Sequence, residues 1–280
     1  MEPHGNSPSN KVIAVIPARA ASVRLPGKLL REIAGKPVIL HTLERAKKAE
    51  TVSRVIVATD DVGIQDAVLA AGGEAQMTSA EHSSGSDRIA EVAAALPEGS
   101  IIVNVQGDEP LISPETIDRA VRAMLEPRQG DIEPDIVTVY ETFETAEELL
   151  DPNNVKAVVG AGGFALYFSR SVIPWPRNAS QRYGGDLQKT IEDGPELLSQ
   201  FKKHTGIYVY RREYLLEFTR LPQSPLENAE MLEQLRALEN GARIRIVEAA
   251  APSHGVDTEA DLEKVRRIVE TQVSTGSGCK

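Results

Sequence analysis

The sequence has little cysteine, no long apolar run and a shortage of basic residues. Its 280 residues include one cysteine, Cys279, which excludes an intrachain disulfide and a zinc site built on cysteines. No stretch approaches the roughly 18 apolar residues of a transmembrane helix. Residues 1–10 lack the basic region and apolar run of a signal peptide. We therefore expect a cytoplasmic protein with no membrane partner.

The charge balance argues against nucleic acid as a partner. Lys and Arg total 31 against 41 Asp and Glu, for a formal net charge of −10. An acidic surface repels a polyphosphate backbone, so any anion that binds must be met by a local group of Lys and Arg. The five histidines form no HxxxH or HExxH pair, so any metal is expected to be a hard, oxygen-bound ion.

Short apolar runs rich in β-branched residues alternate with segments of helical period in the first half. Such runs are typical of strands buried on both faces of a parallel sheet. The expected strands are 12–16, 54–58 and 101–105, and the expected helices are 38–47, 62–71 and 86–96. This alternation predicts a βαβαβ arrangement.

The second half, beyond residue 130, has strands without obligatory helices between them and predicts a smaller mixed-sheet lobe. The prolines and glycines of 174–195 predict a long exposed loop. A capping box with proline predicts a helix from 225 to about 238, and another helix is expected from 258 to about 270.

Both ends of the chain are polar and carry glycine and serine. We expect residues 1–10 to be a disordered extension and residues 274–280 to be a disordered tail. A single catalytic α/β domain over 11–273 remains between them.

Three cations follow the first expected strand on one loop: Arg19, Arg24 and Lys28. This loop belongs at the carboxyl edge of the sheet, where ligands bind, and its cations suit a triphosphate. A solvated basic loop is the alternative. There is no GxGxxG here, and a Walker A motif would need Gly and Ser or Thr where the chain has Ser22 and Leu29.

A carboxylate, Asp108, follows the strand 101–105 in the segment QGDEP. A carboxylate beside a triphosphate implies Mg²⁺, which commonly uses one or two carboxylates and substrate oxygens. Asp257, in HGVDT, is the best candidate for the second carboxylate. The alternatives are a turn residue for Asp108 and a helix N-cap for Asp257.

Longer segments carry a family resemblance, and they occur in this order: PARAASVRLPGK, ATDD, HSSGSDR, VNVQGDEPLI, DPNNVK, ALYFSRSVIPWPR, HTGIYVYR, SPLENAEMLEQLR and GVDT. Together they resemble the 3-deoxy-D-manno-octulosonate (Kdo) cytidylyltransferases, also called CMP-Kdo synthetases, over about residues 11–270. The resemblance implies a Rossmann-like nucleotide-diphospho-sugar transferase fold, with a mostly parallel central sheet flanked by helices and a smaller mixed-sheet lobe in the second half.

The resemblance also implies a reaction, a cofactor and a partner. CMP would pass from CTP to the 2-hydroxyl of Kdo, giving CMP-Kdo and pyrophosphate in lipopolysaccharide biosynthesis, with Mg²⁺ required. Residues 11–130 would bind the nucleotide, and 131–273 would bind the sugar and form a homodimer. The alternatives are a cytidylyltransferase for 8-amino-Kdo or a sialic acid, and a noncatalytic nucleotide-binding protein of the same fold.

The site residues that the resemblance implies fall into three groups. Arg19, Lys28, Asp108 and Asp257 would be catalytic, and the two aspartates would bind the metal. The nucleotide would be bound by Pro17, Ala18, Arg19, Arg24, Lys28, Ala58, Thr59, Asp60, Ser84, Gly85, Arg88 and Gln106. The sugar would be bound by Gln106, Arg170, Arg177, His204, Tyr208, Glu230 and Gln234.

Several of these residues have simpler explanations. The segment SSGS, which includes Ser84 and Gly85, could be an ordinary loop in which Ser86 caps a helix. Tyr208 could be strand packing, and Glu230 could lie on a solvated helix face. Glu230 and Gln234 are expected one helical turn apart, on one face of one helix.

Overall fold

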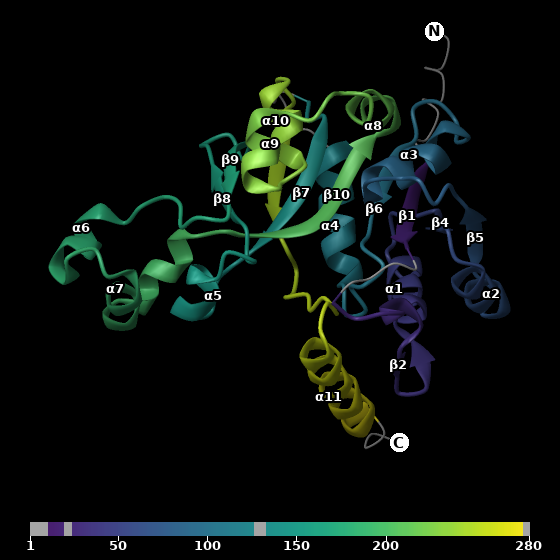
Figure 1. Cartoon of the computed structure of the whole chain (residues 1–280), viewed down its shortest axis with the longest axis horizontal. Helices are drawn as coiled ribbons and strands as arrows, with labels where there is room; N and C mark the ends of the chain where they lie inside the picture. The colour runs from purple at the N-terminus through teal and green to yellow at the C-terminus, as the bar shows by residue number, and fades with distance from the viewer. Residues whose placement is uncertain (1–10, 20–23, 126–132, 277–280) are drawn as a thin grey trace, which may run out of the picture. The chain divides into compact units, whose positions relative to one another are not determined.

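The computed structural model describes residues 11–19, 24–125 and 133–276 (Figure 1). They belong to two compact units. Of these described residues, the first unit comprises those within 1–118, 209–219 and 253–280, and the second comprises those within 119–208 and 220–252. The expected disordered extension, 1–10, lies outside the described residues, as do 277–280.

The first unit contains a parallel sheet in the order β6-β1-β4-β5. Its strands are β1 (Val12–Ala18), β4 (Arg54–Thr59), β5 (Glu74–Met77) and β6 (Ile101–Asn104). Val15 of β1 pairs with Ile56 on one side and Asn104 on the other. The three predicted strands are confirmed. β5 was not predicted because its sequence, EAQM, is polar and only partly buried.

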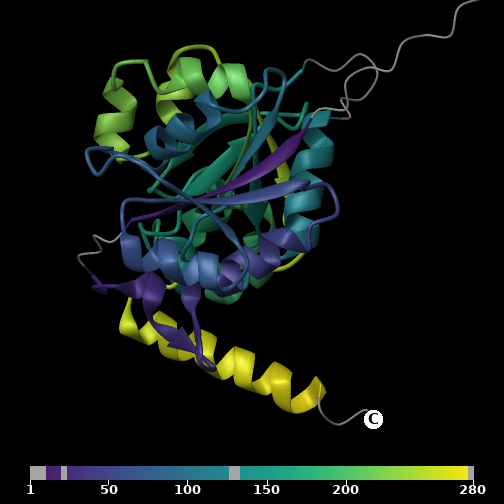
Figure 2. The same cartoon turned by 90° about the vertical axis from the view of Figure 1, so that its right-hand side faces the viewer.

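Helices cover this sheet (Figure 2). They are α1 (Val38–Lys47), α2 (Val62–Ala70), α3 (Gly85–Ala94) and α8 (Arg212–Phe218), and the three predicted helices are confirmed. The Asp61 side chain starts α2 by accepting a hydrogen bond of 2.8 Å from the Ile64 amide. α3 starts with a capping box in which Ser84 and Asp87 satisfy each other's amides. The cap is therefore Ser84 rather than Ser86.

The remaining elements of the first unit are short, apart from α11 (Glu259–Gly276). They are the single turn η1 (Lys28–Leu30) and the antiparallel pair β2 (Glu32–Ile33) and β3 (Lys36–Pro37). α11 continues beyond residue 270, where the predicted helix ended. The helix α4 (Pro114–Leu125) contributes residues to both units.

The second unit is mixed, as predicted. β7 (Ile136–Glu141) and β11 (Ile244–Glu248) pair in parallel, whereas β8 (Lys156–Val159) and β9 (Ala165–Ser169) pair antiparallel. β10 (Lys203–Arg211) pairs antiparallel with β8, and its residues up to Tyr208 belong to this unit.

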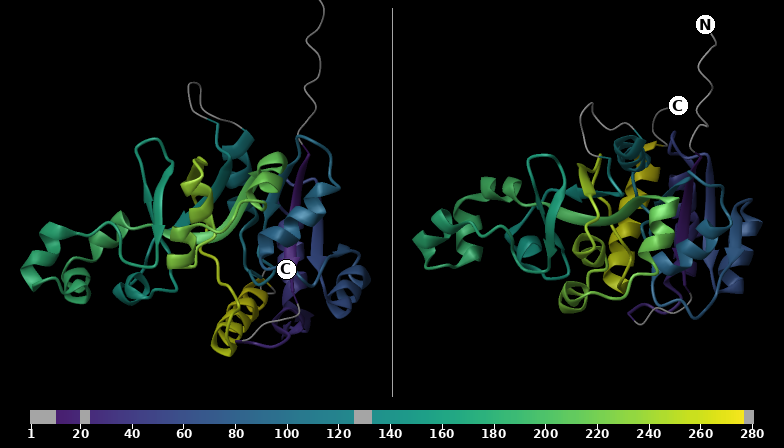
Figure 3. Two further views of the ribbon diagram at one scale, coloured as in Figure 1. Left: turned by 45° about the horizontal axis from the view of Figure 1, so that its top comes forward. Right: turned by 90° about the horizontal axis from the view of Figure 1, so that it is seen from above.

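Most of the segment 174–195 is helical, so the predicted long loop was wrong. It contains α6 (Arg177–Ser180), η2 (Gln181–Tyr183) and α7 (Leu187–Asp193), followed by η3 (Pro195–Gln200). Figure 3 shows α6 and α7 grouped near α5 (Ala146–Leu150). Ile191 and Leu198 are buried in one apolar cluster with Leu149 and Phe201. The prolines and glycines stand at the ends of the helices, where they do not interrupt them.

The helix expected from 225 to about 238 is two helices. α9 (Pro225–Glu230) ends where Met231 adopts a left-handed conformation with φ 53°, and α10 (Gln234–Glu239) follows. Glu230 and Gln234 therefore do not share one helix face, contrary to the prediction. Among the described residues, no helix has both the length and the apolar character needed to cross a membrane.

Candidate functional site

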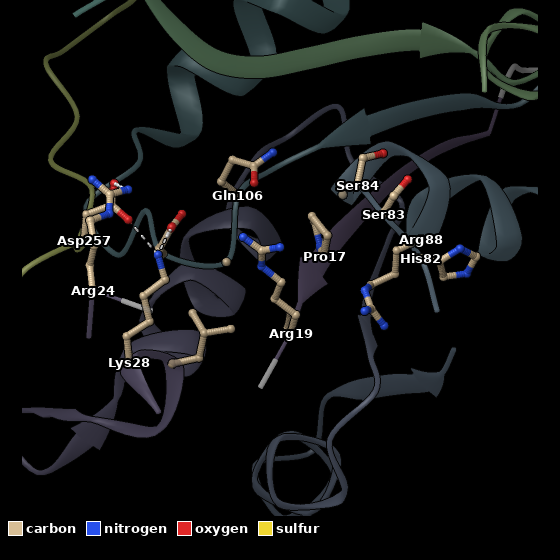
Figure 4. Close-up of a pocket in the computed structure, with 15 residues that line it drawn as sticks. Pro17, Arg19, Arg24, Lys28, His82, Ser83, Ser84, Arg88, Gln106 and Asp257 are labelled. Carbon is tan, nitrogen blue, oxygen red and sulfur yellow. Dashed lines mark hydrogen bonds and ion pairs between the residues drawn. The ribbon is translucent and has the colours of Figure 1, made fainter. Parts of the chain in front are cut away.

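A cavity of about 490 Å³ lies in the first unit, at the carboxyl ends of β1 and β6 (Figure 4). The loop after β1, the start of α3 and one residue near the chain's end complete its wall. Its lining residues are Pro17, Ala18, Arg19, Arg24, Lys28, Leu29, His82, Ser83, Ser84, Gly85, Arg88, Gln106, Gly107, Asp108 and Asp257. The wall thus combines the cationic loop with both candidate metal ligands.

Asp108 is placed by close packing of the loop after β6. A Cβ atom on the preceding Gly107 would lie 3.0 Å from the Pro17 carbonyl oxygen and 3.2 Å from Ile39 Cδ1, so the loop lies tightly against β1 and α1. The Thr42 hydroxyl of α1 donates a hydrogen bond of 2.9 Å to the Gly107 carbonyl oxygen. A side chain at position 107 would require a shift of these neighbours.

Lys28 bridges the two aspartates. Its Nζ lies 2.5 Å from Asp108 Oδ2 and 2.9 Å from Asp257 Oδ1. Arg24 Nη2 lies 2.8 Å from the other oxygen of Asp257, and Figure 4 shows these groups meeting at one end of the cavity. Gly27, in the left-handed region with φ 64°, starts the turn that carries Lys28.

The charges of this cluster shift each other's protonation. Burial alone would lower the pKa of Lys28, but Asp108 and Asp257 outweigh it, and the net effect raises that pKa. Burial alone would raise the pKa of Asp257, but Lys28 and Arg24 outweigh it, and the net effect lowers that pKa. Both groups are therefore held in their charged forms.

Asp108 and Asp257 fit a hard divalent cation, because their carboxylates already converge on a single cationic group, the Lys28 ammonium. Within the described residues, no group of three or more His, Cys, Asp or Glu side chains has metal-binding geometry. Two carboxylates leave most of an octahedral coordination sphere to substrate oxygens and water.

Arg88 lines the cavity but has its guanidinium held by neighbouring residues. Its Nη1 lies 2.5 Å from the Thr78 hydroxyl and its Nη2 lies 2.8 Å from Asp60 Oδ2, and the side chain is buried. Ala58, Thr59 and Asp60 do not line the cavity, although they were expected to contact the nucleotide. Asp60 instead holds Arg88 in place.

Arg19 and Gln106 line the same cavity from two different strand ends. Arg19 follows β1 and is exposed, and Figure 4 shows its guanidinium directed into the cavity. Gln106 follows β6, and its amide nitrogen donates a hydrogen bond of 2.9 Å to Asn104 Oδ1. The amide orientation of Gln106 is therefore set by a buried neighbour.

Four lining residues were not predicted: Leu29, His82, Ser83 and Gly107. His82 Nε2 lies 2.5 Å from Glu91 Oε2, and the Ser83 hydroxyl donates a hydrogen bond of 2.8 Å to Asp87. Both residues belong to the segment HSSGSDR, from which the prediction took only Ser84, Gly85 and Arg88. They are the two residues that precede the helix cap Ser84, and that position was the signal that could have identified them.

In the second unit, hydrogen bonds join Arg170 and Glu230. Both oxygens of Glu230 accept hydrogen bonds, at 2.6 Å from the Ser169 hydroxyl and at 2.9 Å from the Arg170 amide. The Arg170 guanidinium donates to the carbonyl oxygens of Glu230, Pro152 and Met231. Glu230 is thus not a solvated helix-face residue.

His204 and Tyr208 lie on one face of β10, since residues four apart in a strand point to the same side. Their ring centroids are 5.4 Å apart, and Phe168 packs edge-on to His204 at 5.0 Å. Burial lowers the pKa of His204 to about 4 and raises that of Tyr208. Ile207 and Val209, on the opposite face, are buried in the core. Both ring side chains are therefore neutral at pH 7.

The other two residues expected to bind the sugar lie on other elements than this pair. Arg177 is exposed at the start of α6, and Gln234 is buried at the start of α10. All these residues belong to the second unit, whereas Gln106 belongs to the first.

The combination of a parallel α/β unit, a cationic loop after β1 and paired carboxylates is typical of an enzyme that transfers a nucleotidyl group. Residues 13–244 match the Cytidylyltransferase family. The chain belongs to this family.

Curated relatives that match most of the chain carry a more specific name than the family does. The chain is 50% identical over 257 residues to the 3-deoxy-manno-octulosonate cytidylyltransferase of Geobacter sulfurreducens, covering 91% of this chain and 97% of that one. It is 45% identical over 270 residues to the protein of the same name from Solibacter usitatus, covering 96% and 98%.

Solved structures agree. A CMP:2-keto-3-deoxy-manno-octonic acid synthetase complexed with CTP matches with a TM-score of 0.81 and 43% identity, over 94% of this chain and all (100%) of that one. A nucleotidyl transferase from Methanothermobacter matches with a TM-score of 0.59 and 15% identity over 94% and 99%, which supports the fold alone.

Proposed function

We propose that the chain transfers CMP from CTP to the 2-hydroxyl of Kdo, releasing pyrophosphate and forming CMP-Kdo for lipopolysaccharide biosynthesis. The observation that carries this function is the Lys28 ammonium held between Asp108 and Asp257 in a cavity that Arg19 and Arg24 also line. Relatives that cover almost the whole chain carry the name of this activity.

The cationic loop binds and orients the triphosphate. Arg19 and Arg24 present planar sets of N–H donors that match pairs of phosphate oxygens. Lys28 supplies a compact charge that stabilises the negative charge developing on the α-phosphoryl group and on the leaving pyrophosphate. These residues act by positioning and charge, which is most of what phosphoryl transfer requires of a protein.

We propose Mg²⁺ as the cofactor, held by Asp108 and Asp257. When bound, it would supply Lewis-acid neutralisation of phosphate charge. The support is the convergence of the two carboxylates on one cationic group. For the protein residues, this role requires that Asp108 and Asp257 remain ionised, which the lowered pKa of Asp257 favours.

We propose that the acidic sugar is recognised by the second unit. Its cluster of His204, Tyr208 and Phe168 offers rings and a neutral imidazole for a polyhydroxylated substrate. Because the Arg170 guanidinium already donates to backbone carbonyls, we assign it the role of holding the loop after β9. Arg177 is exposed and remains the proposed cation for the sugar carboxylate.

A homodimer in the cytoplasm is a further part of this proposal. Its support is a set of exposed apolar side chains in the second unit: Leu166 at 65%, Trp175 at 53% and Met231 at 75% exposed. Light scattering of the purified chain should give the mass of two copies, and the mass of one copy would refute the dimer.

The test is pyrophosphate release with CTP, UTP, ATP and GTP, each paired with Kdo, 8-amino-Kdo and N-acetylneuraminate. Release confined to CTP with Kdo supports the proposal. Release with CTP and only another sugar would favour a different acidic-sugar cytidylyltransferase, and CTP binding without release would favour a noncatalytic nucleotide-binding protein. EDTA should abolish release and added Mg²⁺ should restore it.

A further inference from the structure

The hydroxyl of Thr138 lies at the junction of three polar groups in the second unit. Its Oγ1 is 2.7 Å from the Ile207 carbonyl oxygen, 2.9 Å from His204 Nε2 and 3.4 Å from the Thr205 carbonyl oxygen. Thr138 is on β7, beside β10 (Figure 1), and is fully buried with 0% exposure. Water therefore cannot supply an alternative partner for this hydroxyl.

Only one arrangement of hydrogen atoms makes every close contact of the Thr138 hydroxyl a hydrogen bond. A hydroxyl has a single hydrogen, and a carbonyl oxygen can only accept. If Thr138 donated to His204, its oxygen and the Ile207 carbonyl oxygen would face each other at 2.7 Å with no proton between them. If Thr138 donates to Ile207 instead, the His204 Nε2–H donates to Thr138 and every close contact is a hydrogen bond.

We infer that Thr138 is a positioning residue that fixes His204 as the Nε2–H tautomer, so that Nδ1 is a hydrogen-bond acceptor for a hydroxyl of the substrate sugar. Within the described part of the chain, Nδ1 of His204 has no hydrogen-bond partner. The ring is also held from two sides, by Phe168 and Tyr208. Its orientation is thus set before any ligand binds.

This assignment rests on the proposed function. It gives the hydroxyl groups and the carboxylate of the acidic sugar to different protein residues. A neutral imidazole that presents a lone pair accepts from a hydroxyl and repels a carboxylate oxygen. The neutral form is favoured because burial lowers the pKa of His204. His204 therefore binds a hydroxyl group of the sugar, and a cationic residue elsewhere must bind the sugar carboxylate.

The direct test is the ring protonation pattern of His204. The full-length protein is labelled with ¹⁵N-histidine, and long-range ¹H–¹⁵N correlation spectra are recorded at pH 7.5, with the His204→Gln variant assigning the signal. Wild type and Thr138→Ser, which keeps the hydroxyl, should show protonated Nε2 and unprotonated Nδ1. Thr138→Val, which has the same shape without the hydroxyl, should show a mixture of tautomers. Wild type with protonated Nδ1, or Thr138→Val with an unchanged pattern, would overturn the inference.

The second measurement addresses the ligand. Adding Kdo should shift the Nδ1 signal of wild type, and this readout does not depend on turnover. With CTP saturating, Thr138→Val should raise KM for Kdo by about three- to tenfold with little change in KM for CTP, and Thr138→Ser should restore the wild-type value. A Nδ1 signal unmoved by Kdo in an enzyme that turns Kdo over would refute the acceptor role. Absence of turnover with every sugar would refute the proposed function and leave the tautomer to the spectra of the free protein.

Discussion

The backbone amide of Val256 donates a hydrogen bond of 2.8 Å to the carbonyl oxygen of Asp108. This contact and the Lys28 bridge hold Asp257 beside Asp108, although the two residues are far apart in the chain. Gly255 allows the approach, because a Cβ atom there would lie 3.1 Å from Glu109 Oε1. The paired carboxylates are thus a product of backbone docking between the loop after β6 and the segment before α11.

Replacing either aspartate should abolish most of the activity. Asp108→Asn and Asp257→Asn keep the side-chain shape but remove the charge, so each should lower the rate of pyrophosphate release by at least about 100-fold through weakened metal binding and charge placement. Glu259→Gln is the matched control, because Glu259 is close in sequence and pairs with Arg31 at the surface. A near-normal rate in either Asn variant would contradict its proposed role.

Lys28→Met should lower kcat more than it raises KM for CTP. The ammonium acts on charge that develops during transfer, and methionine keeps the length of the chain without that charge. The variant also leaves Asp108 and Asp257 facing each other, so the pKa of Asp257 should rise. Lys28→Arg, which keeps the charge, is the comparison. The measurement is steady-state kinetics at saturating substrates. Equal kcat for wild type and Lys28→Met would show that the Lys28 charge does not contribute to the transfer step.

Gly107→Ala should destabilise the first unit by about 1–3 kcal/mol, because the added methyl has no room between the Pro17 carbonyl and Ile39. Gly85→Ala is the control. It also lines the cavity, but its Cβ would make ordinary contacts of 3.6 Å with Pro17. Urea unfolding should give a lower free energy of unfolding for Gly107→Ala than for Gly85→Ala. Equal values would show that the loop after β6 accommodates the methyl group without loss of stability.

The stability of the protein should depend on His204 below neutral pH. Burial lowers the pKa of His204 from 6.5 to about 4, so between these values the unfolded chain binds more protons than the folded one. The free energy of unfolding should therefore fall as pH decreases through this window, by at most about 1.4 kcal/mol per pH unit, and should be unaffected by His204 above it. Urea titrations at pH 7.5 and 5.0 should show a smaller pH effect in His204→Gln. An identical pH effect in both proteins would contradict the burial argument.

Local sequence patterns were sufficient for the first unit. The run over 12–16 is apolar at every position, and the structure extends it to β1, in which all five residues are buried. The helical period over 38–47 coincides with α1. The cationic loop could be assigned to the cavity because the carboxyl edge of a parallel sheet is where such loops converge.

Features that depend on tertiary contacts could not be predicted. The segment 174–195 reads as a loop until Ile191 is placed in an apolar cluster with Leu149, which lies far away in sequence. The interruption between α9 and α10 arises at Met231, a residue type that ordinarily continues a helix. The occupied guanidinium of Arg170 depends on carbonyl groups from two distant segments, which no local pattern reveals.

The Lys28 cluster has a further consequence for how a polyanion enters the cavity. Without a bound metal ion, Arg24 and Lys28 are matched by Asp108 and Asp257, so these four side chains sum to zero charge. An arriving triphosphate therefore exchanges counterions with groups that are already paired, and it does not neutralise a bare positive patch. Long-range attraction must come from Arg19, which has no ion pair within the described ranges. We expect the affinity for the nucleotide to depend on ionic strength as it would for one unpaired cation. This dependence is much weaker than the one expected for three unpaired cations on the loop.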